Sequence, residues 1–114
     1  RFSPMFNFQK LDSYIVARQF AQLVHQAGIA DPELRDQVTR AAKSVFLNIS
    51  EGLPDHRTGI RRRHFEAARN SLAEAVAGID LATVLNALQP ARSEALLAVA
   101  YRLAPIIGGL LKRK

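Results

Sequence analysis

The chain has 114 residues, a formal net charge of +6 and an apolar share of 48%. This length suits one compact domain with a single core, and this apolar share argues against an intrinsically disordered chain. The sequence contains no cysteine, which excludes a disulfide framework and a thiolate metal site.

The first predicted helix covers about residues 9–27. Val16, Phe20 and Val24 recur at helical spacing and predict its inner face. The helix should end at Gly28, because glycine readily adopts the left-handed conformation that often follows a helix.

The second predicted helix covers about residues 32–51. Asp31 can accept hydrogen bonds from the free amides at its start, and Pro32 suits the first helical position. We expect Gly52 and Pro54 to end this helix.

The third predicted helix runs over about residues 59–88, with Thr58 or Asp55 as its cap, and the fourth over about residues 90–111. Pro105 lies inside the fourth helix and lacks a backbone donor, so we expect it to kink the helix or loosen its last turn.

Strand signals are nearly absent, and the connections between the predicted helices are short. Four helices joined in this way pack best as an antiparallel up-down bundle. We therefore predict that residues 1–114 form one all-α domain, a four-helix bundle.

The predicted helices carry more apolar residues than one core obviously needs. A wide stripe facing the core would explain them, and so would self-association, because large exposed apolar patches are unusual on a monomer. The surplus residues are Phe46, Leu47, Leu81, Val84, Leu85, Leu88, Leu97 and Tyr101.

Three stretches resemble the bacterial four-helix bundle protein family, also called the 23S ribosomal RNA intervening-sequence proteins. They are "FQKLDSYIVA", "QVTRAAKSVFLNISEG" and "FEAARNSLAEA". The matching positions are Tyr14, Ala17, Arg40, Ala41, Ala42, Ser44, Asn48, Ile49, Glu51, Gly52, Ala68, Arg69, Ser71, Leu72 and Glu74.

The resemblance implies a cytosolic, non-enzymatic bundle that forms a ring-shaped homopentamer. A related branch of the family serves diversity-generating retroelements as an accessory factor that contacts reverse transcriptase and nucleic acid. The sequence departs from the family pattern at Phe46, Ser50 and Arg61. Because Arg61 falls on the apolar stripe of its helix, it should either extend outward or precede the ordered helix.

A polar row follows the second predicted helix, with Arg40, Ser44 and Glu51 in line and Asn48 beside them. In an antiparallel pair of helices, Glu51 would face the level of Arg61 and Arg62. Arg40 would face Glu74, and Ser44 would approach Ser71. We expect interhelical ion pairs and hydrogen bonds, and Asn48 is a candidate to bind a loop backbone group.

The polar row contains no histidine, so a serine nucleophile there would lack its usual base. The three histidines, at positions 25, 56 and 64, show no metal-binding spacing. We therefore expect no enzymatic activity, no metal and no cofactor. A hydrolase that uses Glu51 would need a pocket around that carboxylate.

Four arginines surround the start of the third predicted helix: Arg57, Arg61, Arg62 and Arg63. The helix dipole disfavours cations at this end, so something should offset their charge. The internal candidates are Glu51, Asp55 and Glu66, and the external candidate is a phosphate backbone.

The leading hypothesis is a self-assembling bundle that presents basic surface to RNA, DNA or a nucleic-acid enzyme. The alternative is a structural or regulatory protein-interaction module with no nucleic-acid role. The first ten residues lack the apolar core of a signal peptide, and charged residues interrupt the apolar runs. We expect a cytoplasmic homo-oligomer that does not contact a membrane.

Overall fold

The computed structural model describes residues 4–113 and consists of helices, with no strand in this range. The prediction of an all-α chain with four helices is confirmed. The helices are α1 (Asp12–Gln26), α2 (Pro32–Gly52), α3 (Thr58–Val84) and α4 (Pro90–Lys112), and a short 3₁₀ helix, η1 (Asn7–Lys10), precedes them.

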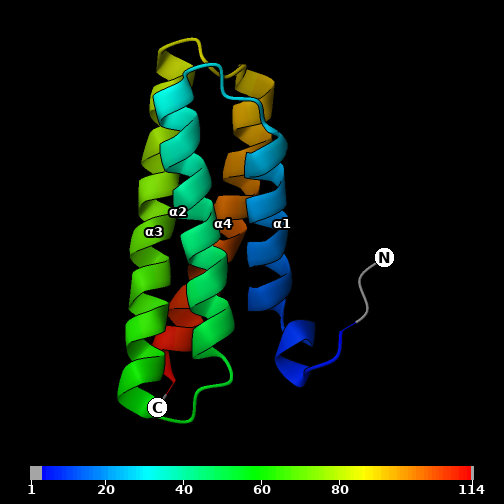
Figure 1. Cartoon of the computed structure of the whole chain (residues 1–114), viewed down its shortest axis with the longest axis vertical. Helices are drawn as coiled ribbons and strands as arrows, with labels where there is room; N and C mark the ends of the chain where they lie inside the picture. The colour runs from blue at the N-terminus through cyan, green and yellow to red at the C-terminus, as the bar shows by residue number, and fades with distance from the viewer. Residues whose placement is uncertain (1–3, 114) are drawn as a thin grey trace.

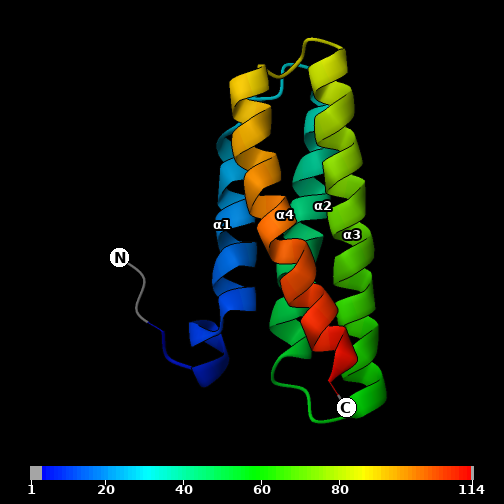
Figure 2. The ribbon, with the colours of Figure 1, turned by 180° about the vertical axis from the view of Figure 1, so that it is seen from behind.

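The α1–α2 and α3–α4 connections lie together at the upper end of the molecule, and the α2–α3 connection lies at the lower end (Figures 1 and 2). The backbone amide of Ala30 joins the two upper connections by donating to the carbonyl of Ala87 at 2.8 Å. Helices adjacent in sequence contact each other, and α1 also contacts α4.

The turn between α1 and α2 follows the sequence prediction. Gly28 has a φ of +65°, a conformation that costs a glycine little. The Asp31 carboxylate accepts a hydrogen bond from the backbone amide of Leu34 at 3.0 Å. Pro32 is the first residue of α2.

Two predicted helix boundaries are wrong. The first helix begins at Asp12 instead of residue 9, because Asn7–Lys10 form the separate turn η1. The third helix ends at Val84 instead of residue 88. It ends there because Asn86 takes a left-handed conformation with φ +60°, which asparagine tolerates better than most residues.

Helix α4 continues through Pro105 to Lys112. A proline at this position leaves the carbonyl of Tyr101 without its helical donor. Both residues are exposed, so water can satisfy that carbonyl. The expected loosening of the last turn is wrong, and Gly108 lies within the helix.

The core runs along the facing sides of the four main helices. Its largest fully buried side chains include Phe20, Ile29, Ile49, Phe65, Ile79, Leu103 and Ile107. Helices α2 and α3 approach closely at Gly78, where an added Cβ would lie 2.5 Å from Cγ2 of Val38. At Gly52 an added Cβ would lie 2.7 Å from Cε1 of Phe65.

The surplus apolar residues divide between core and surface. Leu88 is buried, whereas five members of the set are exposed. The exposed members are Leu47, Leu81, Val84, Leu85 and Tyr101. A wide core stripe therefore accounts for only part of the surplus.

Within the described residues, α4 is long and apolar enough to cross a membrane by length and composition, with a mean hydropathy of 1.5. Its charges are spaced so widely that an 18-residue window holds no more than two. The expectation that charges interrupt every such run is wrong for α4. A core helix of a bundle meets the same test, and 39% of the window is buried.

Candidate nucleic-acid interface

Two serines meet where α2 packs against α3. Oγ of Ser44 lies 2.8 Å from Oγ of Ser71, which confirms the predicted approach of these two residues. Asn48, one turn further along α2, donates from Nδ2 to the Ser44 carbonyl at 2.9 Å and to Ser44 Oγ at 3.2 Å. A hydroxyl oxygen has two acceptor lone pairs, so Ser44 Oγ can accept from Asn48 and still share a hydrogen bond with Ser71 in either direction.

His64 extends this polar network from α3. Its Nδ1 lies 3.1 Å from Oδ1 of Asn48 and 3.6 Å from Oε2 of Glu51. The amide of Asn48 is oriented by its bond to the Ser44 carbonyl, so Oδ1 is the acceptor and His64 Nδ1 carries a hydrogen. Asn48 thus binds a side chain of α3 and its own helix, and the predicted bond to a loop is wrong.

His64, and not the predicted Arg61 or Arg62, is the partner of Glu51 on α3. The expected contact placed Arg61 and Arg62 opposite Glu51, a difference of less than one helical turn along α3. The spacing of the two helices predicts only the approximate level of contact, and the length of the α2–α3 connection decides the exact one. The 65% exposure of the Glu51 side chain makes this contact a weak one.

Three charged residues of the family motif lie on the surface. Arg40, Arg69 and Glu74 are exposed, and none forms an ion pair within residues 4–113. Arg40 donates from Nε to the carbonyl of Asp36 at 3.3 Å. The predicted pairing of Arg40 with Glu74 is not formed, because an exposed pair contributes too little to hold two long side chains.

Arg61 caps the end of a neighbouring helix. Its Nη1 donates to the carbonyls of Gly52, at 3.1 Å, and of Leu53, at the C-terminus of α2. Its guanidinium also lies 5.0 Å from the centre of the Phe65 ring. Carbonyls at a helix C-terminus lack helical donors and carry partial negative charge. Arg61 therefore lies inside α3 and turns toward α2, in neither of the two positions predicted for it.

Arg62 does the same for α4. Its Nη1 donates to the carbonyl of Leu111 at 2.8 Å, and its Nε lies 3.7 Å from Oε2 of Glu66. The start of α3 lies beside the ends of α2 and α4, so cations that are unfavourable for α3 are favourable for both neighbours. Only carboxylates were predicted as internal partners of these arginines. The carbonyls at the ends of α2 and α4 were not predicted.

Arg57 pairs with Asp55 in the connection before α3. The Asp55 carboxylate accepts from Nη2 of Arg57 at 2.8 Å, from Nε at 3.1 Å and from its backbone amide at 2.9 Å. These bonds, led by those from the side chain, lower the pKa of Asp55 to about 2. Asp55 is therefore ionised and engaged, and neither it nor Thr58 caps α3 with its side chain.

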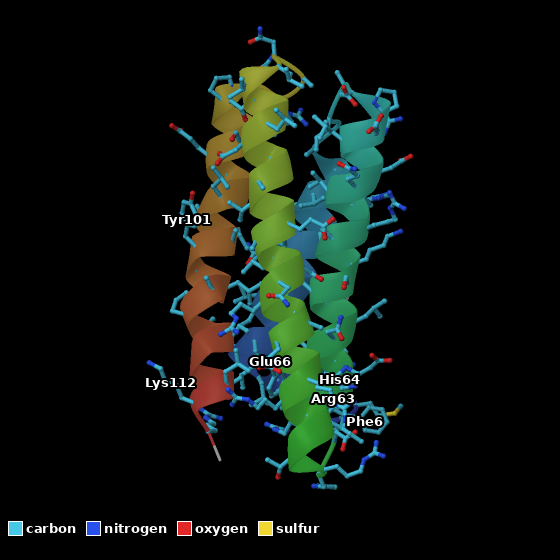
Figure 3. All side chains as sticks on the ribbon, turned by 90° about the vertical axis from the view of Figure 1, so that its left-hand side faces the viewer. Phe6, Arg63, His64, Glu66, Tyr101 and Lys112 are labelled. Carbon is cyan, nitrogen blue, oxygen red and sulfur yellow. The ribbon has the colours of Figure 1, made fainter. Side chains whose placement is uncertain are left out.

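Arg63 is exposed and forms no hydrogen bond or ion pair with the described residues. Figure 3 shows Arg63 and His64 in the lower part of α3 and Lys112 at the neighbouring end of α4. We call this part of the surface the basic end. It consists of Arg57, Arg61, Arg62, Arg63, Lys112 and Arg113.

The polar network does not bring a serine next to a base. Ser44 is bonded to Ser71 and Asn48, and Asn48 separates it from His64. In the part of the chain that the structure describes, no group of three or more histidines or carboxylates is placed to hold a metal ion.

These features define a class of small all-α proteins whose polar motif joins two helices and whose cations gather at one end. The 23S rRNA-intervening sequence protein family model matches residues 9–109, so the chain belongs to that family. The resemblance found in the sequence is thereby confirmed. A search of curated proteins gave no match.

Proposed function

We propose that this protein is a non-enzymatic, self-assembling bundle that presents its basic end to nucleic acid or to a nucleic-acid enzyme. In this proposal the helices form an antiparallel up-down bundle, and the assembly is a cytoplasmic ring, a homopentamer by family resemblance. The observation that carries the proposal is the basic end itself, where six cationic side chains come from two helices and a connection.

The charge balance at the basic end supports an anionic partner. Asp55 is fully engaged by Arg57, and Glu66 lies beside Arg62. Arg63, Lys112 and Arg113 have no carboxylate partner among the described residues. Clustered cations attract a phosphate backbone through a salt-dependent interaction that does not read sequence.

The proposal is tested by fluorescence anisotropy with labelled single-stranded RNA and DNA over a range of salt concentrations. The double change Arg63→Ala and Lys112→Ala removes two cations that have no carboxylate partner among the described residues and do not cap another helix. We expect weaker binding, and a slope of log affinity against log salt that is shallower by about one to two units.

Lys43→Ala with Arg102→Ala is the matched control. It removes the same charge from exposed positions outside the basic end. Equal weakening by both double changes would mean that only net charge matters, and it would contradict a localised interface.

A second candidate function is protein interaction without nucleic acid. A groove of about 220 Å³ between α3 and α4 favours it, because its lining is almost entirely apolar. Tyr101, Val76 and Ala104 are among the residues that line it, and Tyr101 is 61% exposed. Association that survives nuclease treatment, together with no retention of nucleic acid at low salt, would favour this function.

A further inference from the structure

A cavity of about 320 Å³ opens between the start of α3 and the end of α4. Three arginines line it, Arg61 and Arg62 from α3 and Arg113 from the residue after α4. Phe65 and Leu111 supply apolar wall. This volume lies at the lower limit of small-molecule pockets, which span about 300–1,000 Å³.

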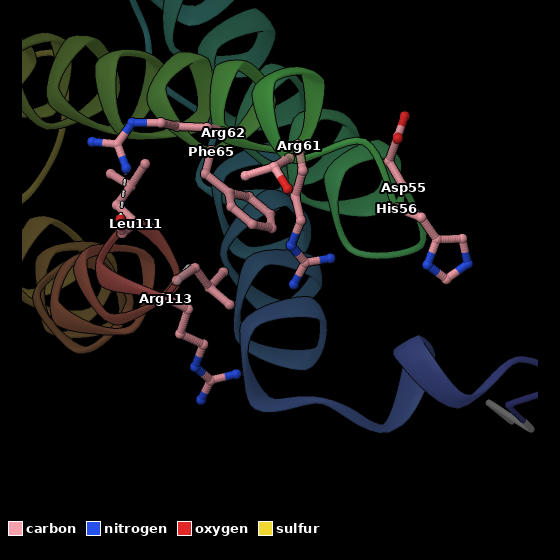
Figure 4. A pocket seen from close by; sticks show the side chains of 9 residues that line it. Asp55, His56, Arg61, Arg62, Phe65, Leu111 and Arg113 are labelled. Carbon is pink, nitrogen blue, oxygen red and sulfur yellow. Dashed lines mark hydrogen bonds between the residues drawn. The ribbon is translucent and has the colours of Figure 1, made fainter.

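The charge that the cavity presents to a ligand is more positive than the identities of its lining residues suggest. Its one lining carboxylate, Asp55, is engaged by Arg57. In Figure 4 the guanidinium groups of Arg61 and Arg113 extend on the same side of the cavity, and the Asp55 carboxylate points away from them. Arg61 and Arg113 therefore line the cavity without a carboxylate partner among the described residues, whereas Arg62 lies 3.7 Å from Glu66.

The guanidinium groups retain donors for a ligand. Arg61 uses Nη1 for the end of α2, and Arg62 uses Nη1 for Leu111. Each guanidinium has five N–H groups, so several remain on both side chains. Arg113 forms no hydrogen bond or ion pair with the described residues.

We infer that this cavity binds the terminal phosphate of a nucleic-acid strand. A phosphate monoester has three terminal oxygens, whereas a phosphodiester within a strand has two, so the monoester can accept from more of the guanidinium N–H groups that line the cavity. The helix ends close one side of the cavity, which suits the end of a strand better than its middle. This inference rests on the proposed function for the nature of the polymer.

The inference is tested by comparing one oligonucleotide with a 5′-phosphate, a 3′-phosphate or hydroxyls at both ends. We expect one of the phosphorylated forms to bind about tenfold more tightly than the hydroxyl form, which is the contribution of one charge-assisted hydrogen bond. Arg113→Ala should abolish this preference, since Arg113 lines the cavity and caps no other helix.

Lys112→Ala is the matched control. It removes the same charge from the neighbouring residue, whose side chain does not line the cavity. It should leave the preference intact. Equal affinities for the three oligonucleotides would overturn the inference and leave backbone binding, and thus the proposed function, in place.

Titration with inorganic phosphate and with adenosine monophosphate, followed by NMR of the arginine Nε–H groups, tests the cavity without a strand. We expect saturable shifts at Arg62 and Arg113 that Arg113→Ala weakens. Shifts without oligonucleotide binding would contradict the proposed function and would assign the cavity to free nucleotides. No saturable shift with either ligand would overturn the inference.

Discussion

Arg61 shows how one side chain serves two helices at once. It belongs to the first turn of α3, yet its hydrogen bonds go to the last carbonyls of α2. Its guanidinium also stacks over Phe65, which is 1% exposed. The Gly52 carbonyl also accepts from the backbone amide of Asp55 at 3.2 Å, so losing the arginine would leave the partly covered carbonyl of Leu53 unsatisfied.

We expect Arg61→Ala to lower the free energy of unfolding by about 1–3 kcal/mol, the range for hydrogen bonds that involve a charged group. Urea denaturation followed by circular dichroism would measure the change. Arg63→Ala serves as the control, because Arg63 is exposed at the same end of the same helix. It should change stability by no more than a few tenths of a kcal/mol, because Arg63 is exposed and lies beyond the first turn of α3, where the dipole effect has fallen off. Equal effects of the two changes would contradict the capping role of Arg61.

For single residues, contacts between near neighbours in the chain were predictable from the sequence, and contacts between distant positions were not. The hydrogen bond from the amide of Leu34 to the carboxylate of Asp31 was predictable from a few adjacent residues. The acceptors of Arg61 and Arg62 lie 8 to 49 positions away in the chain. Their identity depends on which helix ends lie beside α3, and a helical periodicity does not contain that information.

At the scale of elements, α2 and α3 approach closely at two places where a glycine replaces a side chain. Gly78 lies against Val38, and Gly52 lies against Phe65. A glycine inside a helix is unfavourable by itself, so a close contact is a physical reason for its presence at position 78. The Ser44–Ser71 bond joins the same two helices between these points.

We expect Gly78→Ala to lower the free energy of unfolding by about 1–3 kcal/mol, because the added methyl group would overlap Val38. Gly108→Ala is the contrasting change. Nothing lies within 4 Å of its added Cβ, so it should raise stability by about 0.4–1 kcal/mol. Thermal unfolding of both variants would measure the difference.

Val38→Ala makes the explanation of the Gly78 effect testable. If the overlap is the cause, the double change Gly78→Ala with Val38→Ala should cost less than the two single changes added together. Strict additivity would show that Gly78 has another role.

The number and type of main helices were predictable because their apolar stripes and caps are strong local signals. The end of α3 was not, because Asn86 marks it in place of the glycine or proline that usually indicates a turn. The path of α4 through Pro105 was predicted, but the intact last turn was not, since it depends on Pro105 facing outward.

At the scale of the whole molecule, large apolar side chains are exposed on the segment before α1 and on each of the four main helices. Leu81, Val84 and Leu85 lie at the end of α3, and Tyr101 lies over the α3–α4 groove. An exposed apolar set of this kind indicates a surface that another molecule covers. The proposed self-assembly supplies such a molecule in a second copy of the chain.

Sedimentation equilibrium at micromolar concentration would test the proposed assembly. We expect a mass several times that of one chain, and we expect Tyr101→Glu to reduce it by placing a charge at the groove. Arg102→Glu changes an exposed neighbour that does not line the groove, and it should leave the mass unchanged. A stable monomer of the unaltered chain would contradict self-assembly.

The two arginines that cap α2 and α4 bear on the basic end in a further way. An unrestrained arginine side chain loses much of its rotamer entropy when it binds an anion, and this loss weakens the complex. Arg61 and Arg62 are already held by main-chain carbonyls, so folding has fixed them before any anion arrives. The same bonds that keep the helix ends from fraying thus preorganise two guanidinium groups for recognition.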